Sequence, residues 1–356
     1  MAETAEGRKD GCEIAVLVAA RNGERYLKEQ LNSILSQEGE APAVLVSDDC
    51  SEDGTAQILR EYERRFPERV AVILRKKPSG GAAAHFLWLL RLAALSGGDA
   101  SRREKAREEI RRAAGEGERF EAAAALLERA SFFMLSDQDD VWLPGKAARL
   151  KARLKERMEL CPLKPLLIHS DLSVTDKALR VIAPSFFAYQ KVDPARTALP
   201  QLLVQNVVTG GAVMMNRAMA SLLEQPPEVC LMHDSWLALV ASCFGEILCL
   251  REPLYFYRQH GENTLGAQKG DSPAQALERL KDGSRAKENY RRMFGQAACL
   301  LSIYGERLCG SQREMLAAFV SLPEKSRLGK IRLMLRYGFV KDTWLRTLGQ
   351  MIFMGD

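Results

Sequence analysis

The chain has 356 residues, which is long enough to bury a full hydrophobic core as one large domain with an appendage or as two domains. Hydrophobic residues make up 47% of it and charged residues 27%, and these ordinary globular values exclude a disordered protein. The net charge of +5 is small and spread along the sequence, so nucleic acid is not an expected partner.

Cysteine usage and hydropathy bear on the cellular compartment. The eight cysteines have irregular spacing and no Cys-x-x-Cys pair, which is typical of reduced thiols in a cytosolic protein. Residues 1–12 are polar, are predicted to be disordered, and lack the apolar segment of a secretory signal. No apolar run approaches the roughly 18 residues of a membrane span. We therefore expect a cytoplasmic protein, or one bound peripherally to the inner face of the cell membrane.

Strands and helices alternate in the first part of the sequence. An apolar strand at Ile14–Ala20 is followed by an amphipathic helix. A second strand at Ala43–Ser47 leads through a polar turn into a helix that runs to Phe66, and Val70–Leu74 is a third strand. Such alternation predicts an α/β fold with a parallel sheet covered by helices. Ligands bind such sheets at the carboxyl ends of the strands.

The pattern changes after the third strand. Residues Ser96–Ala130 are rich in Ala, Arg and Glu, which predicts an exposed helical hairpin interrupted at Gly115 and Gly117. A strand at Ser131–Ser136 follows, and from about Ser272 onward the pattern is helical. Three further apolar stretches are candidate strands of the same sheet: Leu166–His169, Val207–Met215 and Ile247–Leu250.

Three carboxylates stand within four residues in the segment Asp137-Gln138-Asp139-Asp140, at the end of an apolar strand. Because they repel one another, a positive group is expected beside them. Mg²⁺ or Mn²⁺ fits this requirement, since each is bound by one or two carboxylates together with the phosphate oxygens of a diphosphate. An acidic cap for the following helix is the alternative, and the motif alone does not decide between the two.

A second acidic cluster, Ser47–Thr55, follows the second strand. A carboxylate there can accept a hydrogen bond from N3–H of a uracil or thymine ring. The alternative is a helix-capping turn, which Asp53-Gly54-Thr55 also predicts. The two interpretations are compatible.

Three motifs in this order resemble the family 2 glycosyltransferases. They are Val16-Leu17-Val18-Ala19-Ala20-Arg21-Asn22-Gly23, Ser47-Asp48-Asp49-Cys50-Ser51-Glu52-Asp53-Gly54-Thr55 and Phe133-Met134-Leu135-Ser136-Asp137-Gln138-Asp139-Asp140-Val141-Trp142. The third motif is similar to the bacterial rhamnosyltransferase-like branch. The resemblance continues through Gly210-Gly211, His233-Asp234-Ser235-Trp236 and Tyr257-Arg258-Gln259-His260-Gly261-Glu262-Asn263, and so covers roughly residues 13–266.

The resemblance implies a GT-A fold, in which a mixed, mostly parallel sheet is flanked by helices. Residues 13–270 would form the catalytic domain, with residues 96–130 as a helical insertion. Residues 271–356 would form a helical C-terminal region. Sugar transfer would invert the anomeric carbon. Asp139 would bind the metal, with Asp140 behind it, and the nucleotide-sugar pocket would include Ala20, Arg21, Asn22, Asp49, Asp137, Gly211 and Arg258.

An inverting transfer needs a general base for the acceptor hydroxyl, and the resemblance implies Asp234 for this role. A partly buried Asp beside Trp236 would have a raised pKa, which makes it a better base. From the residues alone, an Asp that starts the helix Ser235–Cys243 is the stronger interpretation, and the resemblance reverses that order.

A further strand is predicted at Leu254–Gln259, and two residues at its end are candidates for contact with the metal or the diphosphate. His260 can ligate Mn²⁺ or neutralise the leaving group, and a hydrogen-bonded structural histidine is the alternative. Arg258 is a candidate diphosphate clamp because its guanidinium presents a fixed fork of donors. The pair Gly210-Gly211 predicts a close approach of the backbone to donor or acceptor, or else a bulge in a strand.

The resemblance implies transfer of a sugar, with rhamnose as one candidate, from a dTDP or UDP donor to a cell-surface polysaccharide or lipid-linked glycan. A sugar-1-phosphate nucleotidyltransferase is one alternative, although the Gly-rich basic loop expected after its first strand is missing. A non-catalytic glycan-binding scaffold is another, although it would not require both the metal site and the base.

The tail Ser321–Asp356 carries seven basic and three acidic residues among regularly spaced apolar ones. This pattern is typical of helices that lie on an anionic membrane. Packing against the catalytic domain or a second subunit is the alternative.

Overall fold

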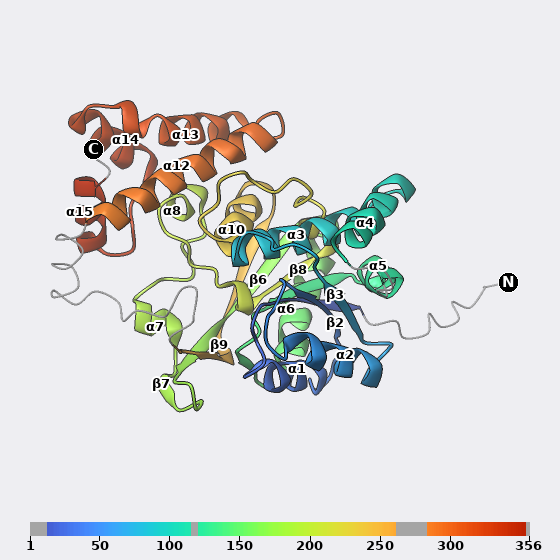
Figure 1. Ribbon diagram of the computed structural model, residues 1–356. Helices are drawn as coiled ribbons and strands as arrows, with labels where there is room; N and C mark the ends of the chain where they lie inside the picture. Colours follow the sequence, from blue (N-terminus) through green and yellow to red (C-terminus); the bar gives the residue numbers. More distant parts are fainter. Residues whose placement is uncertain (1–12, 115–119, 261–282, 354–356) are drawn as a thin grey trace.

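The computed structural model describes residues 13–114, 120–260 and 283–353. Within them, nine strands form one sheet at the centre of the molecule (Figure 1). The strands are β1 (Ile14–Ala20), β2 (Ala43–Asp48), β3 (Val70–Leu74), β4 (Phe132–Ser136), β5 (Val141–Trp142), β6 (Leu166–Thr175), β7 (Val181–Ala183), β8 (Val213–Asn216) and β9 (Glu246–Arg258).

The sheet is mixed. Its order is β3-β2-β1-β4-β8-β6-β9-β5, with β7 paired to β6. The first four strands in that order are parallel, β8 is antiparallel to β4 and β6, and β6 and β9 are parallel. This arrangement confirms the predicted α/β class with a mixed sheet.

Side chains alternate between the two faces of the sheet, as the pleat requires. On β1, Ala15 and Leu17 pack on one face, and Val16 and Val18 pack on the other. The second face is covered by α1 (Leu27–Leu35), α2 (Thr55–Arg65) and α6 (Lys146–Leu160). The first is covered by α3 (Ala82–Ser96), α4 (Ala100–Ala113), α5 (Phe120–Arg129), α9 (Arg217–Ala220) and α10 (His233–Phe244).

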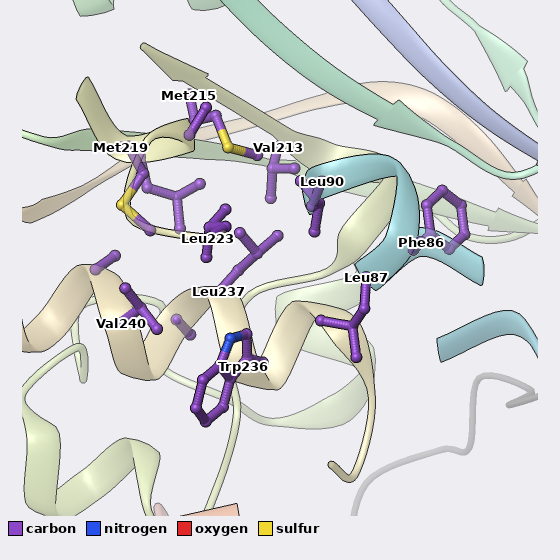
Figure 2. Close-up of a cluster of buried hydrophobic side chains, with 14 of the residues drawn as sticks. Phe86, Leu87, Leu90, Val213, Met215, Met219, Leu223, Trp236, Leu237 and Val240 are labelled. Atoms are coloured by element: carbon purple, nitrogen blue, oxygen red, sulfur yellow. The ribbon is translucent and has the colours of Figure 1, made fainter. Parts of the chain in front are cut away.

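The core of the first face joins α3 and α10 to β8. Figure 2 shows Leu87 and Leu90 of α3 close to Trp236 and Leu237 of α10, with Met215 above them. Trp236 and Leu237 are completely buried. The N-terminal turns of α3 and α10 are therefore fixed beside the carboxyl ends of the first strands.

The helical hairpin predicted over residues 96–130 is confirmed as α4 and α5, but the expectation that it is exposed is wrong for one face of each helix. Ile110, Ala123 and Leu127 are completely buried, and α5 packs against β2 and β3. Its alanines and leucines cover the sheet while its charged residues face solvent. The predicted breaks at Gly115 and Gly117 lie outside the described residues.

Two strand predictions need correction. The stretch Val207–Met215 is not one strand, because Asn206 bonds the backbone of Val208 through both ends of its amide and a short 3-10 helix, η1 (Gly210–Ala212), follows. Only β8 pairs in the sheet. Conversely, Ile247–Leu250 is part of the longer β9, which continues beside β6 past irregularities near Asp171.

The C-terminal helices lie together at one end of the molecule, coloured orange to red in Figure 1. They are α12 (Gly283–Tyr304), α13 (Gly310–Val320), α14 (Arg327–Tyr337) and α15 (Trp344–Phe353), and η2 (Leu322–Glu324) joins α13 to α14. Short helices α7 (Phe186–Gln190) and α8 (Leu199–Leu202) lie between β7 and η1 in the chain. Among the described residues, none of the helices combines the length and hydropathy that a membrane crossing requires.

The C-terminal helices are joined to the rest of the fold by specific contacts. Gln296 of α12 donates to the Ser235 hydroxyl of α10, and the Tyr304 ring lies 6.1 Å from that of Trp236. Asp342 forms a 2.5 Å ion pair with Arg196. The ion pair of Asp342, which lies in the tail, agrees with the packing alternative for that part of it. The predicted domain boundary near residue 270 lies outside the described residues and stays a prediction.

Candidate active site

The parallel strands bring the predicted site residues to one edge of the sheet. The pairing of β1 with β2 ends at Ala20 and Asp48, and that of β1 with β4 ends at Val18 and Ser136. Arg21, Asp49 and Asp137 follow directly and therefore share this edge. Ala20 itself is buried, with 1% of its surface exposed.

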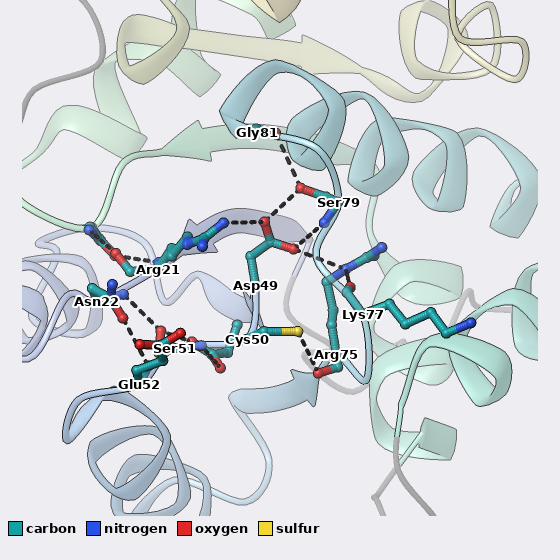
Figure 3. Close-up of polar contacts among 12 residues, drawn as sticks. Arg21, Asn22, Asp49, Cys50, Ser51, Glu52, Arg75, Lys77, Ser79 and Gly81 are labelled. Carbon is teal, nitrogen blue, oxygen red and sulfur yellow. Dashed lines mark hydrogen bonds and ion pairs between the residues drawn. The ribbon is translucent and has the colours of Figure 1, made fainter.

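Asp49 lies in a network of donors at this edge (Figure 3). Its carboxylate accepts hydrogen bonds from the Ser79 amide at 2.6 Å and the Ser79 hydroxyl at 2.7 Å. Arg75 Nε lies 3.3 Å from Asp49, and Arg21 Nη1 lies 4.0 Å away. Since Asp49 is 3% exposed and already bonded, a nucleobase N3–H must compete with these donors for it.

Sequence reasoning missed the partners of Asp49. The Arg75 guanidinium lies 4.4 Å from the centre of the Trp88 ring, which places an aromatic side chain beside the Asp49 network. His85 is buried, Nε2 of its ring has no hydrogen-bond partner, and burial lowers its pKa to about 4. All three residues follow β3. The rule that parallel strands gather ligands at their carboxyl ends would have singled out the segment after β3 and the start of α3.

Gln138 joins the acidic loop to the end of β1. Its amide oxygen accepts from the Arg21 N–H at 2.7 Å, and its amide nitrogen donates to the Arg21 carbonyl at 2.8 Å. Asn22 has a positive φ of 51° and accepts from the Glu52 amide at 2.9 Å. A Cβ on Gly23 would lie 2.5 Å from Gln138, so glycine is required for this approach. The backbone around Arg21 is therefore fixed to both acidic clusters.

Asp139 meets His260 across the sheet edge. His260 Nε2 lies 2.8 Å from the Asp139 carboxylate, and the two side chains are 11% and 14% exposed. Asp140 is buried and accepts from the Arg258 amide at 3.1 Å, so it supports the loop from behind. Within residues 13–114, 120–260 and 283–353 there is no group of three or more His, Cys, Asp or Glu side chains arranged to hold a metal. The described part of the chain thus offers Asp139 and His260 as a donor pair.

Asp137 lies beside the same pair and is half-buried. Burial raises its pKa to about 7, and the negative charges of Asp139 and Asp234 act in the same direction. Because the charge of Asp234 raises the pKa of Asp137, the candidate base lies close to the acidic cluster, although 97 positions separate Asp137 from Asp234 in the sequence.

The guanidinium of Arg258 is engaged by the protein itself. It donates to the Asp139 carbonyl and the Lys177 carbonyl, at 2.8 Å each, and pairs with Glu29. Its side chain is 4% exposed and lies over the Tyr26 ring. A diphosphate could reach it only after these contacts change, so the predicted clamp stays a prediction. The observed contacts hold the Asp139 backbone.

Asp234 lies in the first turn of α10, and its carboxylate is directed at the loop before β8. It accepts from the Asn206 amide at 3.1 Å and from the Gly210 N–H at 3.2 Å. Burial raises its pKa to about 6, and hydrogen bonds from the backbone of Ser235 and Gly210 partly oppose the shift. A half-buried carboxylate with this pKa, such as that of Asp234, is suited to accept a proton near neutral pH.

Gly211 is buried next to this group. Its carbonyl accepts a hydrogen bond from Lys146, a residue that sequence reasoning did not consider.

Comparisons with known proteins agree with this geometry. The family model described as glycosyl transferase family 2 matches residues 15–93, which include β1 to β3. A dTDP-rhamnosyl transferase, RfbG of Shigella flexneri, is 23% identical over 254 residues, which cover 70% of this chain and 74% of the relative. TuaG of Bacillus subtilis, described as a putative teichuronic acid biosynthesis glycosyltransferase, is 34% identical over 71 residues, which cover 20% of this chain and 28% of the relative.

Among solved structures, TarS 1–349 of S. aureus in complex with UDP-GlcNAc aligns with a TM-score of 0.51 at 16% identity. The alignment covers 97% of this chain and 82% of that one, and it supports the GT-A fold. Motifs, sheet topology and relatives agree, and together they support a family 2 glycosyltransferase, an enzyme that transfers a sugar from a nucleotide-sugar donor.

Proposed function

We propose that the chain is an inverting, metal-dependent glycosyltransferase in which Asp234 is the general base. The observation that carries the proposal is the meeting of three groups at one edge of the sheet: the Asp139–His260 pair, Asp137 and Asp234. A donor diphosphate at the pair and an acceptor hydroxyl at Asp234 would place the reacting atoms between them.

The donor set of the pair fits Mg²⁺ or Mn²⁺. One carboxylate and one imidazole, 2.8 Å apart and both partly exposed, leave most coordination positions for diphosphate oxygens and water. We assign Asp139 and His260 as the residues that would hold the ion. The bound ion would supply positive charge to the leaving diphosphate.

The transfer step follows from the position of Asp234. Its carboxylate accepts the proton of the acceptor hydroxyl while that oxygen forms a bond to the anomeric carbon. The bond from this carbon to the diphosphate oxygen breaks, and the nucleoside diphosphate leaves with the electron pair. Asp137, on the nucleotide side of the cluster, would contact the nucleoside. Arg21 and Asn22 would line it, and Ala20, being buried, would contribute only backbone.

The donor base is proposed to be uracil or thymine, held by Asp49, in line with the dTDP and UDP named for the two relatives. A panel of dTDP-, UDP- and GDP-sugars, including dTDP-rhamnose, tests this with purified protein and released nucleoside diphosphate as the readout. Turnover confined to pyrimidine donors supports the assignment. Turnover with GDP-sugars alone contradicts it, since guanine presents a different edge to a carboxylate.

The acceptor is proposed to be a hydroxyl of a cell-surface polysaccharide or lipid-linked glycan, which would bring the enzyme to the inner face of the membrane. Part of the tail is available for such contact. Leu328 and Leu335 of α14 are 81% and 66% exposed, and Arg327, Arg332 and Arg336 of the same helix are exposed with them. Leucines beside arginines on one helix are suited to an anionic lipid surface.

Replacing Leu328 and Leu335 by serine is expected to weaken binding to anionic vesicles, measured by sedimentation, by about tenfold. The reason is that two side chains that would insert into the lipid interface are removed. Solution turnover should not change. Leu160→Ser with Leu163→Ser is the matched control, because these leucines are 73% and 90% exposed on and just after α6. Equal sedimentation of the two double variants would count against a membrane contact through α14.

A further inference from the structure

Lys146 is a buried amine under the candidate active site. It is the first residue of α6 and is completely buried. Its Nζ lies 3.8 Å from the centre of the Trp142 ring and 4.2 Å from that of the Tyr255 ring. The amine donates a 2.5 Å hydrogen bond to the Gly211 carbonyl.

The charge state of Lys146 does not decide this contact. Burial lowers its pKa well below the ordinary value, while Asp140 and Asp137 act in the opposite direction. An ammonium and a neutral amine both donate hydrogen bonds. The link from Lys146 to Gly211 therefore persists in either state.

The Gly210–Gly211 turn has no free space on either side. A Cβ on Gly210 would lie 2.4 Å from Nε2 of His233, and a Cβ on Gly211 would lie 3.1 Å from the Tyr255 hydroxyl. His233 is itself fixed by stacking on Phe86, with ring centres 4.1 Å apart. The position of the turn is thus set by buried groups around it.

Two hydrogen bonds, joined by the backbone of Gly210 and Gly211, link Lys146 to the candidate base. Lys146 bonds the carbonyl of Gly211, and the amide of the adjacent Gly210 bonds the Asp234 carboxylate at 3.2 Å. We propose that Lys146 is a positioning residue, which fixes the Gly210–Gly211 turn and through it orients the Asp234 carboxylate toward the acceptor hydroxyl. This inference rests on the proposed role of Asp234.

Stability alone does not explain a lysine at this position. Burying an amine costs desolvation and the entropy of a long side chain, and an apolar side chain of similar length could fill the space between the two rings. What the amine adds is attraction to the buried carboxylates of Asp140 and Asp137 and the bond to the Gly211 carbonyl, and only the second leads to Asp234.

The test is Lys146→Met, which keeps the stem between Trp142 and Tyr255 but removes the donor. We expect kcat to fall by about 10- to 100-fold, because small misplacements of reacting groups cost rates of this order. Binding of UDP and dTDP in the presence of Mn²⁺, measured by calorimetry, should stay within about twofold. A purely structural lysine would lower the melting temperature and leave kcat unchanged, and that result overturns the proposal.

Lys151→Met is the matched control on the same helix. Lys151 is 8% exposed and forms 2.7 Å ion pairs with Glu13 and Glu40. Its loss is expected to lower the melting temperature without a change in kcat. Equal falls of kcat in both lysine variants would show a general effect of α6 and would overturn the assignment to Lys146.

Gly210→Ala tests the same link if Lys146→Met does not fold. The added methyl must shift the turn away from His233, so the same loss of kcat with retained nucleotide binding is expected, and full kcat would overturn the proposal. Asp234→Asn, measured in parallel, separates a failure of the positioning role of Lys146 from a failure of the proposed base. If it is inactive while Lys146→Met is fully active, only the positioning role fails. If it is fully active, the proposed base itself fails.

Discussion

Asp234→Asn is expected to lose transfer activity by about 10² to 10⁴ in kcat while it keeps its affinity for nucleotide, because an amide cannot take the acceptor proton. The substitution preserves shape, and the amide oxygen can still accept from the Gly210 N–H that now bonds the carboxylate. Rates of sugar transfer and calorimetric Kd values for UDP and dTDP would be measured on the same preparation. A stable variant with the wild-type rate would remove Asp234 from the mechanism.

Asp99→Asn supplies the control for a merely capping aspartate. Asp99 is the N-cap of α4, and its carboxylate accepts from the Arg102 amide at 2.9 Å. Asparagine caps helices about as well as aspartate, so this variant should keep both its melting temperature and its rate. If Asp234 only started α10, the two variants would behave alike.

The pH dependence follows from the same group. Burial raises the pKa of Asp234 to about 6, and a base works only when deprotonated, so kcat/KM should fall as the pH drops below about 6. Asp137, Tyr255 and Cys230 are the titratable groups that interact with it from the neighbouring segments. Of these, Asp137 has a pKa raised to about 7 and titrates in the same range, whereas Tyr255 and Cys230 have pKa values raised by burial and stay neutral. A flat profile between pH 5 and pH 8 would contradict the assignment.

The first part of the fold could be predicted almost to the residue. The expected strand at Val70–Leu74 is β3, and the expected strand at Ala43–Ser47 ends one residue later in β2. These strands are continuous apolar runs between polar turns, because parallel strands are buried on both faces. The prediction failed at Val207–Met215 because apolar content alone cannot reveal the hydrogen bonds of Asn206 that keep Val208 out of the sheet.

The partners of the candidate site residues could not be predicted, because they come from distant parts of the chain. His260 and Asp139 are 121 positions apart, and the pair of Arg258 with Glu29 spans 229. A lone lysine after a Pro-Gly turn is typical of a surface position, so Lys146 was not considered as a site residue. Its spacing of four from Trp142 was the one available signal, and it acquires meaning only once Tyr255 is seen on the opposite side.

Asp139→Asn is expected to abolish the metal-dependent part of nucleotide binding, because the carboxylate and the diphosphate would share one cation. In the presence of Mn²⁺, the affinity for nucleotide should therefore fall by about 10²-fold. The substitution preserves the size of the side chain and leaves the Asp139 carbonyl free to accept from Arg258 as it does now. Calorimetric titration of dTDP and UDP with Mn²⁺ and with chelator would measure the difference. Asp193→Asn, which alters an exposed carboxylate paired with Arg251, is the control and should bind like wild type. His260→Gln should likewise reduce the dependence of nucleotide binding on Mn²⁺, because the imidazole is the second member of the pair. If both site variants kept a wild-type affinity that chelator did not alter, the contact between Asp139 and His260 would be a structural ion pair and the ion would have to bind elsewhere or not at all.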